Sequence, residues 1–135
     1  MLLNHGRSQL KKLDDIVKIR ARNFAQYKAA LPDFFCQNSL TETLSSFAYG
    51  TLVQNRLEVF EFLKRNQIEC RPLICGNIGR HPFWTRVNKT SNLPNADIVH
   101  DFGIYLPNHH NLSLEDVSWV TEAFLEIARP FEVTS

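Results

Sequence analysis

The longest amphipathic pattern in the chain covers residues 8–31. Side chains recur there at alternating spacings of three and four residues, which places them on one face of a helix. The positions of this stripe are Leu10, Leu13, Val17, Arg20, Phe24, Tyr27 and Leu31. Pro32 follows directly and is expected to end the helix, because the residue before a proline disfavours helical geometry. A helix this long in a small domain is more typical of a connector or docking arm than of a core helix.

Three shorter stretches predict β-strands, and one of them contains a proline. Residues 46–53 and 102–106 combine aromatic, apolar and small side chains in the way that strands do. The third stretch, residues 68–75, has Pro72 inside it. Because proline cannot donate a hydrogen bond to a neighbouring strand, either this strand lies at the edge of the sheet or it begins after Pro72.

Two further helices are predicted, one after the first strand and one near the end of the chain. Residues 56–66 carry Leu57, Phe60 and Leu63 on one face. The last helix has Ser113 as its N-cap and Asp116 three residues later, which is the spacing of a capping box. Leu112 and Val117 are predicted to pack together as a hydrophobic staple around the cap. The predicted buried face consists of Leu114, Val117, Val120, Phe124 and Ile127, and Pro130 is expected to end the helix. The order of the elements predicts an α+β fold, in which a small antiparallel or mixed sheet of about three strands is covered by helices in one domain, residues 1–135.

Residues 76–95 show no hydrophobic period and are predicted to form a loop. Phe83 and Trp84 are its only bulky apolar anchor, and residues 96–99 are expected to form a helical turn. A loop of about 20 residues inside a small domain is more often functional than idle.

The stretch from residue 69 to residue 83 contains many hydrogen-bonding side chains. Arg71, Asn77, Arg80 and His81 surround a short apolar run and two glycines. These side chains could present donors to an anionic or polyhydroxylated ligand. The alternative is a strand followed by a loop that carries ordinary solvated charges.

The composition fits one globular domain. The chain has 135 residues, of which 44% are hydrophobic and 21% charged, with a net charge of +1. The lack of a clustered basic excess argues against a nucleic-acid partner. No apolar run reaches the about 20 residues of a membrane span, and the first residues lack the apolar core of a signal peptide. The three cysteines, Cys36, Cys70 and Cys75, are interpreted as reduced, apolar fillers in a cytoplasmic protein.

The sequence contains no complete catalytic set. It has neither a Gly-x-Ser-x-Gly elbow nor a Gly-x-x-x-x-Gly-Lys phosphate loop. His109 and His110 are adjacent, so a metal site built from them would need ligands from elsewhere, and none is predicted. The six lysines are expected to be solvated, since a Schiff-base lysine needs burial or charged neighbours to lower its pKa.

Six blocks of sequence, in the same order, resemble the C-terminal part of the DegT-type sugar aminotransferases. These are pyridoxal-phosphate enzymes with the aspartate-aminotransferase fold. Residues 68–72 are similar to the family's Ile-Glu-x-Arg-Pro strand. Residues 76–82 are similar to a Gly-Asn-x-x-Arg-x-Pro block, which is typical of members that act on lipopolysaccharide sugars. The other blocks are residues 9–24, 93–97, 103–109 and 112–116.

The resemblance implies a small domain from a dimeric enzyme whose substrate, a nucleotide-linked keto sugar, lies with the cofactor between two domains. The substrate-binding residues implied by position are Arg71, Asn77, Arg80, His81 and His109. The family's large domain, with the lysine that binds pyridoxal phosphate, has no counterpart here. No catalytic residue and no covalently bound cofactor are therefore expected, and the chain is expected to be inactive alone.

Two alternatives stay open. The resemblance fits a deoxysugar 3-dehydratase equally well, because the residue that distinguishes the two activities belongs to the large domain. The chain could also be a non-catalytic, self-associating module, because its long first helix would expose an apolar face.

Overall fold

A three-stranded antiparallel sheet lies at the centre of the molecule, in a computed structural model that describes residues 10–37, 44–88 and 92–132. β1 (Ala48–Leu52) pairs with β3 (Gly103–Pro107), and β3 pairs with β2 (Arg71–Pro72), so the strand order is β1-β3-β2. The predicted α+β fold with a small sheet is confirmed.

β2 is a very short edge strand, and its sequence explains why. Only Arg71 and Pro72 pair with β3, although the composition predicted a strand over residues 68–75. Proline has no N–H, so it cannot extend the ladder and is tolerated at an edge. Beyond it, Cys75 and Gly76 have φ angles of 64° and 48°, in the left-handed region, which turns the chain away from the sheet. Cys75 is exposed and does not fill the core, contrary to the prediction.

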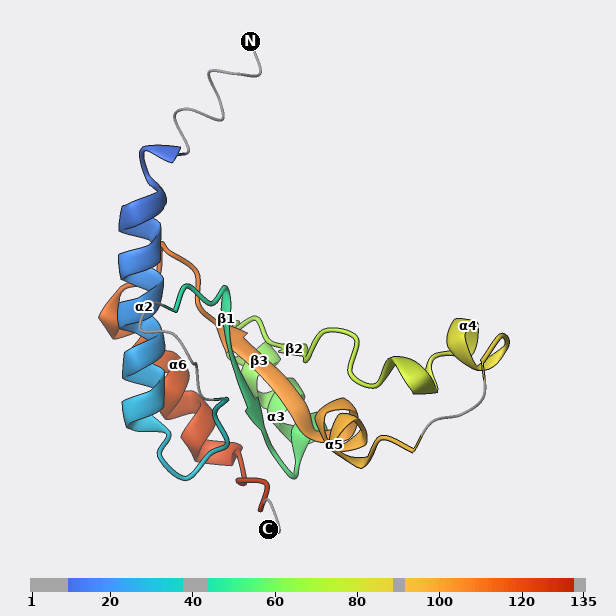
Figure 1. Cartoon of the computed structure of the whole chain (residues 1–135). Helices are drawn as coiled ribbons and strands as arrows, with labels where there is room; N and C mark the ends of the chain where they lie inside the picture. Colours follow the sequence, from blue (N-terminus) through green and yellow to red (C-terminus); the bar gives the residue numbers. More distant parts are fainter. Residues whose placement is uncertain (1–9, 38–43, 89–91, 133–135) are drawn as a thin grey trace.

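Three helices cover one face of the sheet: α2 (Leu13–Ala30), α3 (Arg56–Arg65) and α6 (Leu114–Ile127) (Figure 1). Because side chains alternate along a strand, one set from β1 and β3 faces these helices. The resulting core includes Tyr27, Leu31, Phe34, Tyr49, Val59, Leu63, Ile68, Ile104, Leu106, Val117, Val120 and Phe124.

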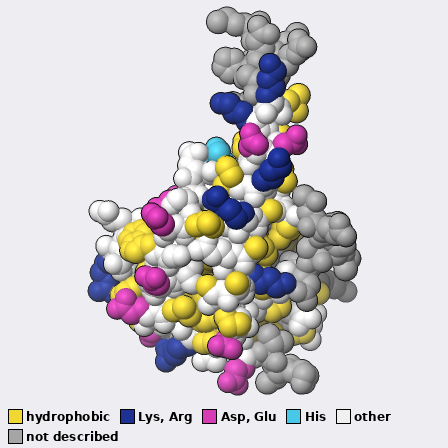
Figure 2. Space-filling model, turned by 90° about the vertical axis from the view of Figure 1, so that its left-hand side faces the viewer, with side chains coloured by type: hydrophobic (Ala, Val, Ile, Leu, Met, Phe, Trp, Pro, Cys, Tyr) yellow, Lys and Arg dark blue, Asp and Glu magenta, His cyan; other side chains and the backbone are white. Residues whose placement is uncertain are grey.

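The first turns of α2 stand out from the body of the molecule (Figures 1 and 2). Leu10 is 69% exposed and Leu13 is 49% exposed, whereas Tyr27 and Leu31 are buried. The Tyr27 hydroxyl donates a hydrogen bond to the Pro107 carbonyl at 2.8 Å, which ties this part of α2 to the end of β3. The predicted apolar stripe is therefore a core face only in the C-terminal half of the helix. The predicted start at residue 8 lies outside the described residues.

The capping box predicted for the last helix is confirmed. The Ser113 hydroxyl accepts a hydrogen bond from the backbone N–H of Asp116 at 3.1 Å, and the Asp116 carboxylate accepts one from the backbone N–H of Ser113 at 2.8 Å. Two predicted core positions are wrong: Leu114 on α6 and Leu57 on α3 are both exposed. On α3 the buried positions are Val59 and Leu63, because these two face α6 and the sheet.

Short helices occupy much of the segment predicted as a loop. They are the 3-10 helix η1 (Ile78–Arg80), α4 (Pro82–Thr85) and α5 (Pro94–Phe102). The predicted helical turn at residues 96–99 belongs to the longer α5. The η1–α4 segment extends away from the sheet (Figure 1). Phe83 and Trp84 are exposed on it, so the prediction that they anchor this segment is wrong.

Candidate functional site

Asn77 is the centre of a polar network that joins the segment after β2 to α5. Its side chain is almost fully buried, with the residue 3% exposed. Its Nδ2 donates to Oδ1 of Asp97 at 2.8 Å, and its Oδ1 accepts from the backbone N–H of Gly79 at 2.8 Å. Its backbone N–H donates to Nδ1 of His100 at 3.2 Å. Asn77 therefore caps η1 and fixes it against α5 at the same time.

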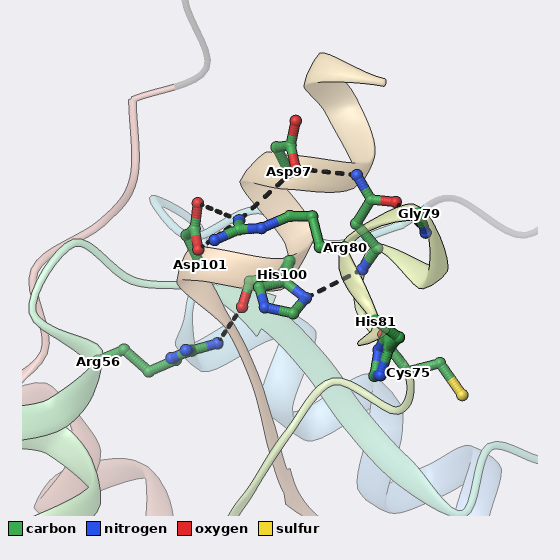
Figure 3. A network of polar contacts seen from close by, with 9 residues as sticks. Arg56, Cys75, Gly79, Arg80, His81, Asp97, His100 and Asp101 are labelled. Carbon is green, nitrogen blue, oxygen red and sulfur yellow. Dashed lines mark hydrogen bonds and ion pairs between the residues drawn. The ribbon is translucent and has the colours of Figure 1, made fainter. Parts of the chain in front are cut away.

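Arg80 forms the second part of the network (Figure 3). Its Nη1 donates to both carboxylate oxygens of Asp101 at 2.8 Å and lies 3.5 Å from Oδ1 of Asp97. Asp97 and Asp101 are four residues apart, with His100 between them at a spacing of three from Asp97, so all three project from one face of α5. One face of α5 therefore makes the side-chain contacts that fix the segment with Asn77 and Arg80 in place.

The two histidines of the network have assigned hydrogen-bonding roles. Nε2 of His81 lies 2.8 Å from the Cys75 carbonyl, which can only accept, so Nε2 of His81 must carry the proton. Nδ1 of His100 accepts from the backbone of Asn77, so the proton of a neutral His100 is on Nε2. Within the described part of the chain, neither Nδ1 of His81 nor Nε2 of His100 forms a hydrogen bond.

Gly76 makes room for His100. A Cβ atom at residue 76 would lie 2.5 Å from Nδ1 of His100 and 3.0 Å from its Cα. With a φ of +48° as well, this position requires glycine both for its backbone conformation and for the close approach of α5.

Arg56 holds the other side of α5. Its Nη1 donates to the carbonyls of His100 at 2.6 Å and Gly103 at 3.3 Å, where the last turn of the helix leaves carbonyls without helical partners. Burial lowers the pKa of the Arg56 guanidinium, and the negative charge of Asp101 partly opposes that change. Arg56 thus stabilises the C-terminal end of the helix that carries the network.

An open groove of about 870 Å³ borders the network on the face of the sheet that the core helices leave uncovered. Leu73, Ile74 and Val99 line its near side, next to Cys75 and His100. The rest of its lining comes from Phe24, Phe35, Gln37, Leu44, Ser46, Ala48, Gly50 and Tyr105. The groove is mainly apolar, and two of its lining residues, Ile74 and Val99, directly precede Cys75 and His100 of the network.

The structure brings together three of the five predicted substrate-binding residues, Asn77, Arg80 and His81. Arg71 is not part of the network; it forms an exposed ion pair with Glu69. It pairs with Tyr105 in the sheet, so its side chain starts on the same face as the groove. His109 is exposed at the opposite end of β3 from the network, where its Nδ1 accepts from the backbone N–H of Asn111 at 3.2 Å.

Asp97, His100 and Asp101 were missed by the sequence analysis. The signal that could have revealed them is their spacing of three and four residues within one helix. The predicted helical turn ended at residue 99 and so did not place them on a common face.

No lysine in the described ranges is buried. Lys11, Lys12, Lys18, Lys28 and Lys64 are all exposed. Lys89 lies outside the described residues. Burial, with a smaller effect of Glu69, raises the pKa of the Cys70 thiol to about 11, so this thiol is protonated at neutral pH. No group of three metal-ligating side chains converges anywhere in the described ranges. Nor does any helix within those ranges have the length and apolar character needed to cross a bilayer.

The fold and the site define a small α+β domain with a polar network beside an uncovered sheet face. The chain belongs to the DegT/DnrJ/EryC1/StrS aminotransferase family, whose model matches residues 4–125. This confirms the resemblance found in the sequence blocks.

Particular relatives show how much of a family member this chain represents. The Salmonella typhimurium lipopolysaccharide biosynthesis protein RfbH is 27% identical, over 90% of this chain and 30% of its own length. The Escherichia coli GDP-4-keto-6-deoxy-D-mannose-3-dehydratase, solved with bound hydrated pyridoxal phosphate, has a TM-score of 0.78 at 23% identity, over 88% of this chain and 33% of its own.

A third relative is PseC of Helicobacter pylori, an aminotransferase of pseudoaminic acid biosynthesis. It has a TM-score of 0.79 at 24% identity, over 90% of this chain and 35% of its own. The two structural likenesses establish the fold. The chain spans about a third of the length of each of these relatives.

Proposed function

We propose that this chain forms the small-domain side of a substrate site in a pyridoxal-phosphate-dependent enzyme that acts on nucleotide-linked keto sugars. The proposal is supported by the polar network of Asn77, Arg80 and His81, which follows directly on residues that line an uncovered apolar groove. Pyridoxal phosphate supplies the electron sink in such enzymes. The residues of this chain contact and orient the sugar, while covalent attachment of the cofactor falls to the part of the enzyme that the relatives have in addition.

Several finer features belong to the same proposal. The enzyme acts as a cytoplasmic dimer in lipopolysaccharide or other cell-surface sugar biosynthesis, in keeping with the name of the Salmonella relative. Both reaction classes, amino transfer and 3-dehydration, occur among the solved neighbours. The proposal therefore covers an aminotransferase and a dehydratase, and the chain by itself has neither activity.

Titration of the ¹⁵N-labelled full chain with GDP-mannose, a stable nucleotide-linked sugar, tests substrate contact. We expect saturable changes in amide chemical shift at Asn77, Gly79 and Arg80, with millimolar affinity because only one side of the site is present. Amides on α6 should stay unchanged. An absence of change around Asn77 at saturating ligand would contradict the proposed function.

Incubation with pyridoxal phosphate, followed by borohydride reduction and mass spectrometry, tests the statement that the chain is inactive alone. We expect no stoichiometric addition of one cofactor at a single lysine, since each described lysine is exposed. A stoichiometric adduct that one lysine substitution removes would overturn that statement.

A second candidate function, self-association, is favoured by two exposed leucines at and just before the start of α2. Leu10 and Leu13 lie on the projecting turns, with Lys11, Lys12, Asp14 and Asp15 around them. Two such turns in antiparallel contact would set lysines of one copy opposite aspartates of the other. Sedimentation velocity should then show a concentration-dependent dimer that a Leu10→Gln/Leu13→Gln variant loses; a strict monomer at high concentration would exclude it.

A further inference from the structure

The positive charges of the polar network are already balanced within the chain. Arg80 donates to both oxygens of Asp101 at 2.8 Å and lies 3.5 Å from Asp97. Arg56, on the other side of α5, also experiences the charge of Asp101. Arg80 therefore has two carboxylates as ion-pair partners, while Arg56 donates to backbone carbonyls. A phosphate group binds where positive charge is left uncompensated, so this network is poorly suited to one.

The network also contains donor and acceptor atoms that form no hydrogen bond to any described residue. Among the described residues, Nε and Nη2 of Arg80, Oδ2 of Asp97, Nδ1 of His81 and Nε2 of His100 form no hydrogen bond, although other atoms of the same side chains do. Arg80, Asp97 and Asp101 keep 40–45% of their side-chain surface accessible, so these groups can reach a ligand. A sugar hydroxyl both donates and accepts, and a mixed set of this kind satisfies it better than an acceptor-only phosphate.

From the charge balance and the free groups, we infer that the network binds the hydroxyl groups of the sugar and not the diphosphate, and that Asp97 and Asp101 determine this preference. The inference rests on the proposed function, because it states which part of the nucleotide-linked sugar this same site contacts. Of the two ligand types that the sequence left open for these side chains, anionic and polyhydroxylated, the inference selects the second. Arg71 differs, since its ion pair with Glu69 is largely exposed, at 75% and 72% of the two side chains, and therefore weak.

The experiment compares three probes on the ¹⁵N-labelled full chain at matched ionic strength: GDP-mannose, GDP and methyl mannoside. We expect GDP-mannose and methyl mannoside to move the amides of Asn77, Gly79 and Arg80, and GDP to leave them in place. If GDP alone reproduces the changes caused by GDP-mannose, the inference is wrong while the proposed function stands. If GDP-mannose itself moves none of these amides, the proposed function fails.

A second experiment removes the two negative charges that are inferred to set the preference for the sugar over the diphosphate. In an Asp97→Asn/Asp101→Asn variant the Arg80 guanidinium loses both of its counter-charges, so we expect GDP to bind near Arg80 about tenfold more tightly than in the wild type. An Asp14→Asn/Asp15→Asn variant changes the net charge equally but on the projecting turns of α2, and should leave GDP binding unchanged. Equal GDP affinity in all three proteins would overturn the inference. If the double variant does not fold, Asp101→Asn alone serves the same comparison.

Discussion

At the scale of single residues, Asn77 gives the sharpest prediction. Asn77→Ala removes the hydrogen bonds to Asp97 and Gly79 from an almost fully buried position. Because a buried group that loses its partner keeps its desolvation cost, we expect the free energy of unfolding to fall by about 1–3 kcal/mol. Urea denaturation followed by circular dichroism measures this.

Asn88→Ala is the matched control for that substitution. Asn88 is exposed, and its side-chain Nδ2 donates a long hydrogen bond, of 3.4 Å, to the Trp84 carbonyl. Its removal should change the free energy of unfolding by less than about 0.5 kcal/mol. Equal losses in the two variants would mean that the network adds no stability.

Asn77 also shows what the sequence could and could not predict about the site. The glycines and polar side chains of residues 69–83 indicated a functional segment, and three of the five implied ligand contacts do lie together. Their partners Asp97, His100 and Asp101 follow about 20 residues later, on a helix that the pattern did not resolve. A motif predicts which side chains can bind, but their existing partners depend on tertiary packing.

At the scale of single elements, the capping box of α6 offers a prediction that depends on pH. Ser113→Ala removes the N-cap oxygen, which should lower the free energy of unfolding by about 1 kcal/mol at pH 7. Hydrogen bonds from the backbone and side chain of Ser113 also lower the pKa of the Asp116 carboxyl in the folded chain.

A folded-state pKa below the unfolded value gives stability that is present above the unfolded pKa and is lost as the pH falls through the folded one. The variant lacks part of this effect, so the difference between wild type and Ser113→Ala should shrink in acid. Urea titrations at pH 7 and about pH 2.5 measure the difference. A gap that widens on acidification would show that the pKa of Asp116 is not lowered by Ser113.

The two halves of α2 should respond differently to the same substitution. Leu31 is 1% exposed and Leu13 is 49% exposed. Leu31→Ala opens a cavity in the core and should cost about 2–5 kcal/mol of unfolding free energy. Leu13→Ala should change it by less than about 0.5 kcal/mol. Thermal denaturation compares the two, and similar losses would mean that the projecting turns are packed.

This contrast also explains the limits of element prediction. Pro32 gave the end of α2, and Ser113 with Pro130 gave both ends of α6, because caps and prolines act locally; α3 was predicted from apolar spacing alone. The spacing of apolar residues predicted a face for each helix but not its burial. Whether Leu13, Leu57 or Leu114 is covered depends on what packs against it, and in this chain nothing described does.

At the scale of the whole molecule, the two faces of the sheet are unequal. The core helices bury one face, while the other forms the floor of the groove. The sequence predicted the layer of helices on a small sheet, and the family blocks predicted the class. Neither could show which face would be left open, because that follows from how α2, α3 and α6 pack together.

The open face leads to a last prediction, about a hydrophobic dye. Ile74 lines the groove and is 63% exposed, and Leu125 is an exposed apolar residue of α6, at 49%. A contiguous apolar surface binds such a dye, whereas a single exposed side chain does not. We expect Ile74→Asp to reduce the fluorescence of anilinonaphthalene sulfonate bound to the native chain several-fold, and Leu125→Asp to leave it nearly unchanged. Both variants should keep the wild-type unfolding midpoint, because neither side chain is buried. Equal fluorescence in the two variants would show that the dye does not report on the groove, and the uncovered sheet face would then lose its role as the floor of the site.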